Sequence, residues 1–323
     1  MPAEAPSLAI VLCTFKRPDL LRRALRSIKA QEAPAGGFGG VTIHVVDNSD
    51  EGDARAIVAE EARTSRWPMV WLEAHPANIS VARNAGVKAG TEDFVAFVDD
   101  DQELEPGWLK ALFDATAHSG ADAWIGRVIG QFETPERATP TIRGLFSREL
   151  DAPSGLELFA FGPQKRGDIS LATNNCVFRR ATCLTDALVF DPAFGRGGGE
   201  DYDLFCRLQR RGRRFVWLPE AAAREFVPAA RCDRAYMRRR AFAGGQAFAE
   251  AIARGGRSPA LARWAIRAKA CVQAALLALR LPIALSGDEP ARADYSFRWA
   301  GVLGKLSFGE IHPLYQSGDQ RRS

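Results

Sequence analysis

Short apolar runs alternate with amphipathic segments over the first 120 residues of the chain. The runs are rich in β-forming residues and predict buried strands; they cover residues 7–15, 41–50, 69–74 and 93–101. Between and after them, apolar positions recur at helical spacing in residues 16–32, 53–65, 80–90 and 105–120. This alternation predicts an α/β domain whose mainly parallel, Rossmann-like sheet is flanked by helices.

Acidic residues follow two of the predicted strands. Asp47 ends one strand, and Asp99, Asp100 and Asp101 end another. Ligands of such sheets bind beyond the carboxyl ends of the strands, so we expect both groups on one rim. Adjacent carboxylates repel one another, and Mg²⁺ or Mn²⁺ carrying a diphosphate would supply the missing positive charge. The alternative is an acidic turn that caps the helix beginning near residue 105.

A glycine-rich loop precedes another acidic helix start at residues 197–212, GGGEDYDLFCRLQRRG. The helix begins with Glu200, Asp201 and Asp203 and ends in arginines, an order that complements the helix dipole. The glycines, however, favour close approach of a ligand, and a carboxylate there could act as a general base. The local pattern leaves both interpretations open.

The segment NISVARNAGV, residues 78–87, gives a weaker signal. Asn78 caps or precedes a helix, and Arg83 and Asn84 could reach a nucleotide or the acidic rim. A purely structural role is favoured on this pattern alone.

The rest of the chain predicts a long excursion over residues 130–170, a return to strand character near 170–180 and helices beyond about residue 228. Residues 268–286 are the most apolar, but Lys269, Gln273, Arg280 and Pro282 interrupt them, which disfavours a membrane span. A helix lying in a membrane interface is expected, flanked by arginines. The alternative is a helix packed on the catalytic domain or on a second subunit.

Composition narrows the class of protein. The 323 residues are 46% hydrophobic and carry a net charge of +4, with arginines concentrated in residues 207–240. That basic stretch fits phosphate, nucleic acid, an anionic membrane or a solvated helix face. Six dispersed cysteines without a CxxC pair and four scattered histidines disfavour a zinc site. The N-terminus lacks the features of a secretory signal, and a reducing, cytosolic compartment is expected.

Together the segments resemble family 2 glycosyltransferases over about residues 7–240. They are IVLCTFKRPDLLRRALRSI, VVDNSD, NISVARNAG, FVAFVDDDQELEPGWLKAL and GGGEDYDLFCRLQRRG, in family order. The resemblance is nearest to the bacterial exopolysaccharide group, such as the succinoglycan glucosyltransferases. It implies a GT-A fold, a nucleotide-sugar donor, inversion by single displacement, and a polyprenyl-diphosphate-linked oligosaccharide as acceptor at the inner membrane.

The resemblance also implies roles for individual residues. Thr14 and Asp47 match positions that hold the nucleoside, and Arg83 and Asp100 lie at the nucleotide. Asp99 and Asp101 match the DxD acids, with Asp101 as metal ligand. Asp201 matches the catalytic base, and Glu200 lies beside it near the acceptor. Many relatives carry a metal-binding His where this chain has Glu225, which would be a third ligand for Mn²⁺ or Mg²⁺.

The motif of processive synthases, QxxRW, is absent, and Arg238–Arg240 are placed to hold the departing diphosphate, so a non-processive enzyme is expected. Residues 1–228 are assigned to the catalytic domain, with a nucleotide-sugar half at about 7–125 and an acceptor half at about 126–228. Residues 229–323 form the helical C-terminal region.

UDP-glucose is the first expectation for the donor, followed by UDP-N-acetylglucosamine, UDP-galactose and GDP-mannose. The expected location is cytoplasmic and peripheral on the inner membrane, without nucleic acid as partner. A nucleotidyltransferase is disfavoured because such an enzyme would have a glycine-rich phosphate loop after the first strand, where this chain has TFKRPDLL without glycine. A non-catalytic glycosyltransferase-like scaffold or lipid-binding protein remains the alternative.

Overall fold

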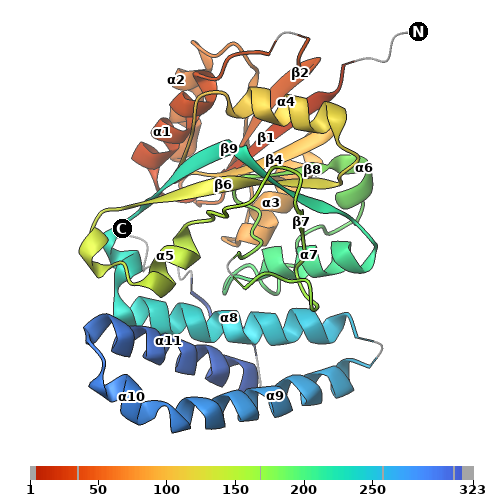
Figure 1. Ribbon diagram of the computed structural model, residues 1–323. Helices are drawn as coiled ribbons and strands as arrows, with labels where there is room; N and C mark the ends of the chain where they lie inside the picture. The colour runs from red at the N-terminus through yellow and green to blue at the C-terminus, as the bar shows by residue number, and fades with distance from the viewer. Residues whose placement is uncertain (1–4, 35, 168, 257, 308–309, 315–323) are drawn as a thin grey trace.

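A computed structural model describes residues 5–34, 36–167, 169–256, 258–307 and 310–314. Figure 1 shows a central sheet with helices on both faces and, below it, a layer of helices formed by the C-terminal region. The predicted α/β class with a helical C-terminal region is confirmed.

The first four strands of the sheet are parallel and are joined by helices. The elements are β1 (Ser7–Thr14), α1 (Pro18–Lys29), β2 (Gly40–Asp47), α2 (Ala54–Ala62), β3 (Met69–Glu73), α3 (Ile79–Lys88) and β4 (Phe94–Asp99). β1 pairs with β2 on one side and β4 on the other, and β3 pairs with β2. Asn78 caps α3, as predicted, because its side chain accepts from the backbone N–H groups of Ser80 and Val81.

The following segment completes the sheet with antiparallel pairs and one more long parallel pair. It contains β5 (Gln102–Leu104), α4 (Trp108–His118), β6 (Ala123–Phe132), η1 (Pro135–Arg137), α5 (Pro140–Phe146), β7 (Glu157–Leu158), β8 (Cys176–Arg179), α6 (Arg180–Cys183), α7 (Glu200–Arg210) and β9 (Phe215–Val227). The strand order is β3-β2-β1-β4-β8-β6-β9-β5, and β7 also pairs with β9. The longer ladders are parallel, whereas β8, β5 and β7 pair antiparallel.

In the described part of the C-terminal region, four helices follow η2 (Ala229–Cys232). They are α8 (Arg234–Arg254), α9 (Pro259–Leu279), α10 (Leu281–Ser286) and α11 (Glu289–Leu306). Figure 1 shows α8 directly beneath the catalytic sheet and α9 and α10 farther from it. Within the described ranges, none of the helices combines the length and apolar character that crossing a bilayer requires.

The two faces of the sheet bury different residues of the same strands. In β1, Leu8, Ile10 and Leu12 belong to one apolar cluster, whereas Ala9 and Val11 belong to the other. This alternation follows from the two-residue period of a strand, and helices covering both faces explain why nearly every position is apolar.

Close helix–sheet contact beneath β1 depends on Gly86 of α3. A Cβ atom at residue 86 would lie 2.3 Å from Cγ1 of Val11. We therefore expect Gly86→Ala to lower the free energy of unfolding by about 1–3 kcal/mol through overpacking. Gly244→Ala is the matched control, because Gly244 is exposed in α8 and an added Cβ there would meet no other atom. This substitution should raise the free energy of unfolding by up to about 1 kcal/mol, since alanine favours a helix more than glycine does. Urea unfolding measures the free energy of unfolding of both variants. A change of the same sign in the two variants would contradict the overpacking at Gly86.

Candidate active site

The acidic rim lies where β1, β2 and β4 end together. In the parallel register, Cys13 pairs with Asp99 and Thr14 pairs with Asp47, so the ends of three strands fall on one edge. Beyond this edge is a cavity of about 290 Å³. Asp99, Asp100 and Asp101 line it together with Thr14, Glu200, Asp201 and Glu225.

Two arginines hold the ends of Asp100 and Asp101. Asp100 accepts a hydrogen bond from Thr14 Oγ1 at 2.8 Å and from Arg17 Nη1 at 3.1 Å. Asp101 Oδ2 lies 3.3 Å from Arg17 Nη1 and 3.0 Å from Arg231 Nη2. These carboxylates are buried and are compensated by protein cations rather than capping the next helix.

Glu225 belongs to the same charge cluster. Its Oε2 accepts from Asn174 Nδ2 at 2.9 Å and from Gln102 Nε2 at 3.3 Å, and its Oε1 lies 3.5 Å from Arg231. Arg231 therefore bridges Asp101 and Glu225, which places Glu225 beside the DxD acids.

The donor set fits a hard divalent cation that also binds substrate. Oδ1 of Asp101 is buried without a hydrogen-bond partner, an oxygen that an ion could use. In the described part of the chain, no three His, Cys, Asp or Glu side chains are arranged to hold a metal by themselves. An ion here would therefore take oxygens from Asp101, Asp99 or Glu225 and others from a diphosphate, the usual mode for Mg²⁺.

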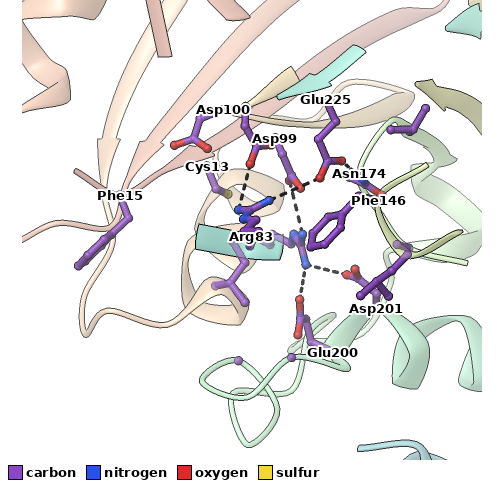
Figure 2. Close-up of a pocket in the computed structure, with 18 of the residues that line it drawn as sticks. Cys13, Phe15, Arg83, Asp99, Asp100, Phe146, Asn174, Glu200, Asp201 and Glu225 are labelled. Carbon is purple, nitrogen blue, oxygen red and sulfur yellow. Dashed lines mark hydrogen bonds and ion pairs between the residues drawn. The ribbon is translucent and has the colours of Figure 1, made fainter. Parts of the chain in front are cut away.

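Arg83 joins the acidic rim to the start of α7. Its Nη1 contacts Glu200 Oε1 and Asp201 Oδ1, both at 2.6 Å, and its Nη2 lies 3.6 Å from Asp99 (Figure 2). Asp201 Oδ1 also accepts from Thr173 Oγ1 at 2.7 Å. The Asp201 side chain is 18% exposed and that of Glu200 only 6%, so Asp201 is the more accessible of the pair.

The loop before α7 has the backbone form that its glycines suggest. Gly198 and Gly199 have φ values of 81° and 103°, a region that other residues rarely adopt. Both line the cavity, and a Cβ at residue 199 would lie 2.4 Å from Cβ of Ala247 in α8. The loop therefore needs glycine for its conformation and for its packing on α8.

Burial raises the pKa of three carboxyl groups at the site. Loss of hydration is the largest cause in each case, raising the pKa of Asp99 to about 6, that of Glu200 to about 7 and that of Glu225 to about 8. Arg83 opposes the rise at Asp99 and Glu200, and Arg231 opposes it at Glu225. The carboxylates in turn raise the pKa of Arg83, which stays charged.

Asp47 lies outside the cavity lining, whereas the other predicted catalytic, nucleotide-binding and metal-binding residues line it: Thr14, Arg83, Asp99, Asp100, Asp101, Glu200, Asp201 and Glu225. It is fully buried, and its two oxygens accept from Ser49 and from the backbone N–H of Ala54 at the start of α2. The neighbouring Asn48 lines the cavity instead. The role of Asp47 in holding a nucleoside stays a prediction, and so do the roles assigned to the other site residues.

Several residues of the site are absent from the sequence-based set. Arg17 and Arg231 contact the acids, Thr173 and Asn174 bond Asp201 and Glu225, and Arg148 donates to Asn174 Oδ1 at 3.1 Å. Of the predicted arginines 238–240, Arg240 lines the cavity. For Arg231 the sole sequence signal is its place in the basic stretch of residues 207–240. No local sequence pattern indicates a role for Arg17, Arg148, Thr173 or Asn174.

A mostly parallel sheet with an acidic rim, a long parallel strand pair and a second acidic cluster at a helix start defines a GT-A glycosyltransferase. Residues 9–182 match Glycosyl transferase family 2, and the chain belongs to this family. The predicted family and enzyme class are thereby confirmed.

Relatives agree with this assignment. The succinoglycan biosynthesis protein ExoM of Rhizobium meliloti (strain 1021) is 31% identical over 253 residues, covering 78% of this chain and 77% of that protein. The GalNAc(5)-diNAcBac-PP-undecaprenol beta-1,3-glucosyltransferase of Campylobacter jejuni is 29% identical over 108 residues, 33% of each chain. Mannosyltransferase PcManGT from Pyrobaculum calidifontis, in complex with GDP-Man and Mn²⁺, has a TM-score of 0.58 at 19% identity, covering 94% of this chain and 87% of its own. This last likeness shows the fold.

The raised pKa of Glu225 gives a pH-dependent stability. A carboxyl group whose pKa is higher in the folded than in the unfolded state stabilises the fold below its unfolded pKa and loses that contribution as pH rises toward about 8. We expect Glu225→Gln, which keeps an acceptor for Asn174, to raise the unfolding free energy of the metal-free protein above pH 8 by on the order of 1–3 kcal/mol, and less at pH 5.

Thermal unfolding in EDTA at several pH values measures this dependence. Glu103→Gln is the control and should show little change, because Glu103 lies in the neighbouring strand β5 on the opposite face from Glu225 and its side chain is 40% exposed. A Glu225→Gln effect that is equal at low and high pH would contradict the assigned cause.

Proposed function

We propose that the protein is an inverting, non-processive glycosyltransferase that adds one sugar to a polyprenyl-diphosphate-linked oligosaccharide during synthesis of a bacterial surface polysaccharide. The relation to a succinoglycan biosynthesis protein and to an enzyme named for an undecaprenol-linked acceptor supports this acceptor class. UDP-glucose is the first candidate donor, and UDP-N-acetylglucosamine and GDP-mannose are the alternatives. The proposed location is the cytoplasmic side of the inner membrane.

The observation that carries the proposal is the position of two acidic groups on either side of Arg83. One guanidinium contacts Asp99 of the DxD segment and Asp201 at the start of α7 (Figure 2). The rim with Asp99 and Asp101 suits the donor diphosphate, and the cavity-facing Asp201 suits the acceptor hydroxyl. A single cavity can then hold both substrates with the anomeric carbon between them.

Asp201 is the proposed general base. Arg83 and Thr173 both bond its Oδ1, which fixes the carboxylate and keeps Oδ2 for the acceptor hydroxyl. As the acceptor oxygen bonds to the anomeric carbon, the bond to the diphosphate breaks and the hydroxyl proton passes to Asp201. Attack from the face opposite the leaving group inverts that carbon without a covalent intermediate.

Positive charge near the rim is proposed to stabilise the leaving nucleoside diphosphate. Arg17, Arg231 and Arg240 line the cavity. A bound Mn²⁺ or Mg²⁺, held by Asp101 with Asp99 or Glu225, would neutralise the charge that develops on the diphosphate. Thr14 and Asn48 line the cavity at the same edge, and their proposed role is to contact the nucleoside.

Nucleotide binding tests the donor half of the proposal. We expect UDP with Mn²⁺ to raise the melting temperature more than UDP alone, and more than GDP or CDP with Mn²⁺. A ligand at a hundred times its Kd stabilises the fold by about 2.7 kcal/mol. Asp101→Asn should lose the metal-dependent part of the shift. A larger shift in melting temperature with GDP would assign a GDP-sugar as donor in place of a UDP-sugar. No shift with any nucleotide would contradict the proposed function.

Transfer by Asp201→Asn tests the acceptor half. We expect this variant to keep its UDP–Mn²⁺ shift and to lose roughly 10²–10⁴-fold in turnover, since the amide cannot take the proton. Transfer of radiolabelled sugar from UDP-sugars to the lipid fraction of bacterial membranes measures turnover. Asp203→Asn is the control, because its carboxylate bonds Arg207 at 2.8 Å and lies outside the cavity lining. Near-normal turnover of Asp201→Asn would exclude it as the base.

A further inference from the structure

The outer surface of α9 is an exposed apolar stripe. Residues three or four positions apart in this helix fall on one face, and every residue of that face is apolar and exposed. They are Leu261, Trp264, Ala265, Ala268, Val272, Ala275, Leu276 and Leu279. Trp264 is 70% exposed and Leu279 77%, values that leave most of these large side chains in water.

The stripe continues into α10. Leu281, Ile283 and Leu285 are 43%, 73% and 61% exposed. Of the twelve large apolar side chains exposed in the described residues, eight belong to residues 261–285. Single exposed apolar residues are ordinary, but a contiguous set of this kind marks an interaction surface. We call residues 261–285 of this face the α9–α10 face.

The α9–α10 face contains no acidic residue. Between Glu250 and Asp288 the sequence contains only basic charged residues, and although Arg263 is paired with Glu250 at 2.9 Å, Lys269 and Arg280 are exposed beside the stripe. Exposed Lys269 and Arg280 directly follow the stripe residues Ala268 and Leu279, which places both at one edge of the face. An apolar face bordered by cations matches a helix that lies in the headgroup region of an anionic bilayer.

We infer that the α9–α10 face docks on an anionic membrane surface, with α9 and α10 lying in the plane of the interface. None of the described helices is long and apolar enough to cross the bilayer. A second copy of the chain is the other candidate occupant. A two-fold dimer through this face would bring the Lys269 and Arg280 side chains of both copies into one interface without an acidic residue on the face to compensate them. Anionic lipid headgroups supply that compensation.

The position of the cavity relative to this face gives a geometric reason for the oligosaccharide part of the proposed acceptor, a step that rests on the proposed function. Arg240 and Gly199 place the cavity against α8, and Figure 1 shows α8 between the catalytic sheet and α9. Packed helices are separated by about 8–10 Å, so the cavity stands at least that far from the lipid. The acceptor hydroxyl must reach it, which an oligosaccharide on lipid diphosphate can do and a bare lipid phosphate cannot.

Vesicle sedimentation of the full chain tests the docking. We expect binding to phosphatidylcholine vesicles that contain phosphatidylglycerol, and little binding to pure phosphatidylcholine. Trp264→Ser with Leu279→Ser should weaken binding roughly tenfold or more. Leu188→Ser with Leu303→Ser is the matched control, because these side chains are 55% and 49% exposed but lie outside the face. Lys269→Glu with Arg280→Glu should remove the preference for phosphatidylglycerol.

Three outcomes would overturn the docking. The first is a wild-type protein that does not bind phosphatidylglycerol vesicles, and the second is a Trp264→Ser, Leu279→Ser variant that binds them as well as the wild type does. The third is a wild-type dimer in analytical ultracentrifugation that this variant dissociates, which would assign the face to a second copy. The UDP–Mn²⁺ thermal shift should be unchanged in every face variant, so failure of docking is distinct from failure of the proposed function.

The acceptor inference has its own readout. Mild acid releases the labelled glycan from the lipid product of a transfer reaction with bacterial membranes. We expect a glycan of several sugars. A single labelled sugar released from the lipid would contradict the inferred distance between the cavity and the membrane.

Discussion

Charge compensation at the carboxyl edge of the sheet is the constraint on which the site depends. Several carboxylates are buried within one small region, an arrangement that raises their pKa values unless cations lie among them. Arg83 contacts buried Glu200 together with the partly exposed Asp99 and Asp201, and its planar fork suits several acceptors at once. Arg17 and Arg231, which lie more than 200 residues apart in the sequence, pair with Asp100 and Glu225.

The same helix that carries Arg83 also anchors the loop that leads to Asp201. Asn78 and Ser80 bond the backbone carbonyls of Pro192 and Asp191, and Asn84 exchanges bonds with the backbone of Phe190. The short polar side chains of α3 therefore fix the distance between the DxD rim and the start of α7. Residues 78–87, whose sequence alone favours a structural role, therefore contain both the helix cap Asn78 and the central cation Arg83 of the site.

Much of the fold follows from local patterns. Strands β1, β2 and β4 are continuous apolar runs because both faces of the sheet are covered, and amphipathic helices separate them. Register then brings Asp47 and Asp99 to one edge. β5 and β6 are not predicted from the sequence, because they pair with β9, about a hundred residues away. Arg17, Thr173 and Arg231 are likewise not predicted, because each contacts an acid that is distant in the sequence. The orientation of Asp47 toward α2, away from the cavity, depends on bonds that spacing cannot reveal.

The long strand β9 limits how this part of the chain can change in evolution. Glu225 pairs with Gln102 in β5 and with Gly130 in β6, and the N–H of Phe226 bonds the carbonyl of Asp101. In a strand, a shift of one residue turns each side chain to the opposite face. Insertion of a single residue before Glu225 would therefore put Arg224, whose side chain is 50% exposed on the other face, in the place of the buried carboxylate. Deletion of a single residue there would put Phe226 in that place. Substitutions along β9 can be accommodated one at a time, but its length is fixed by the chemistry at its centre.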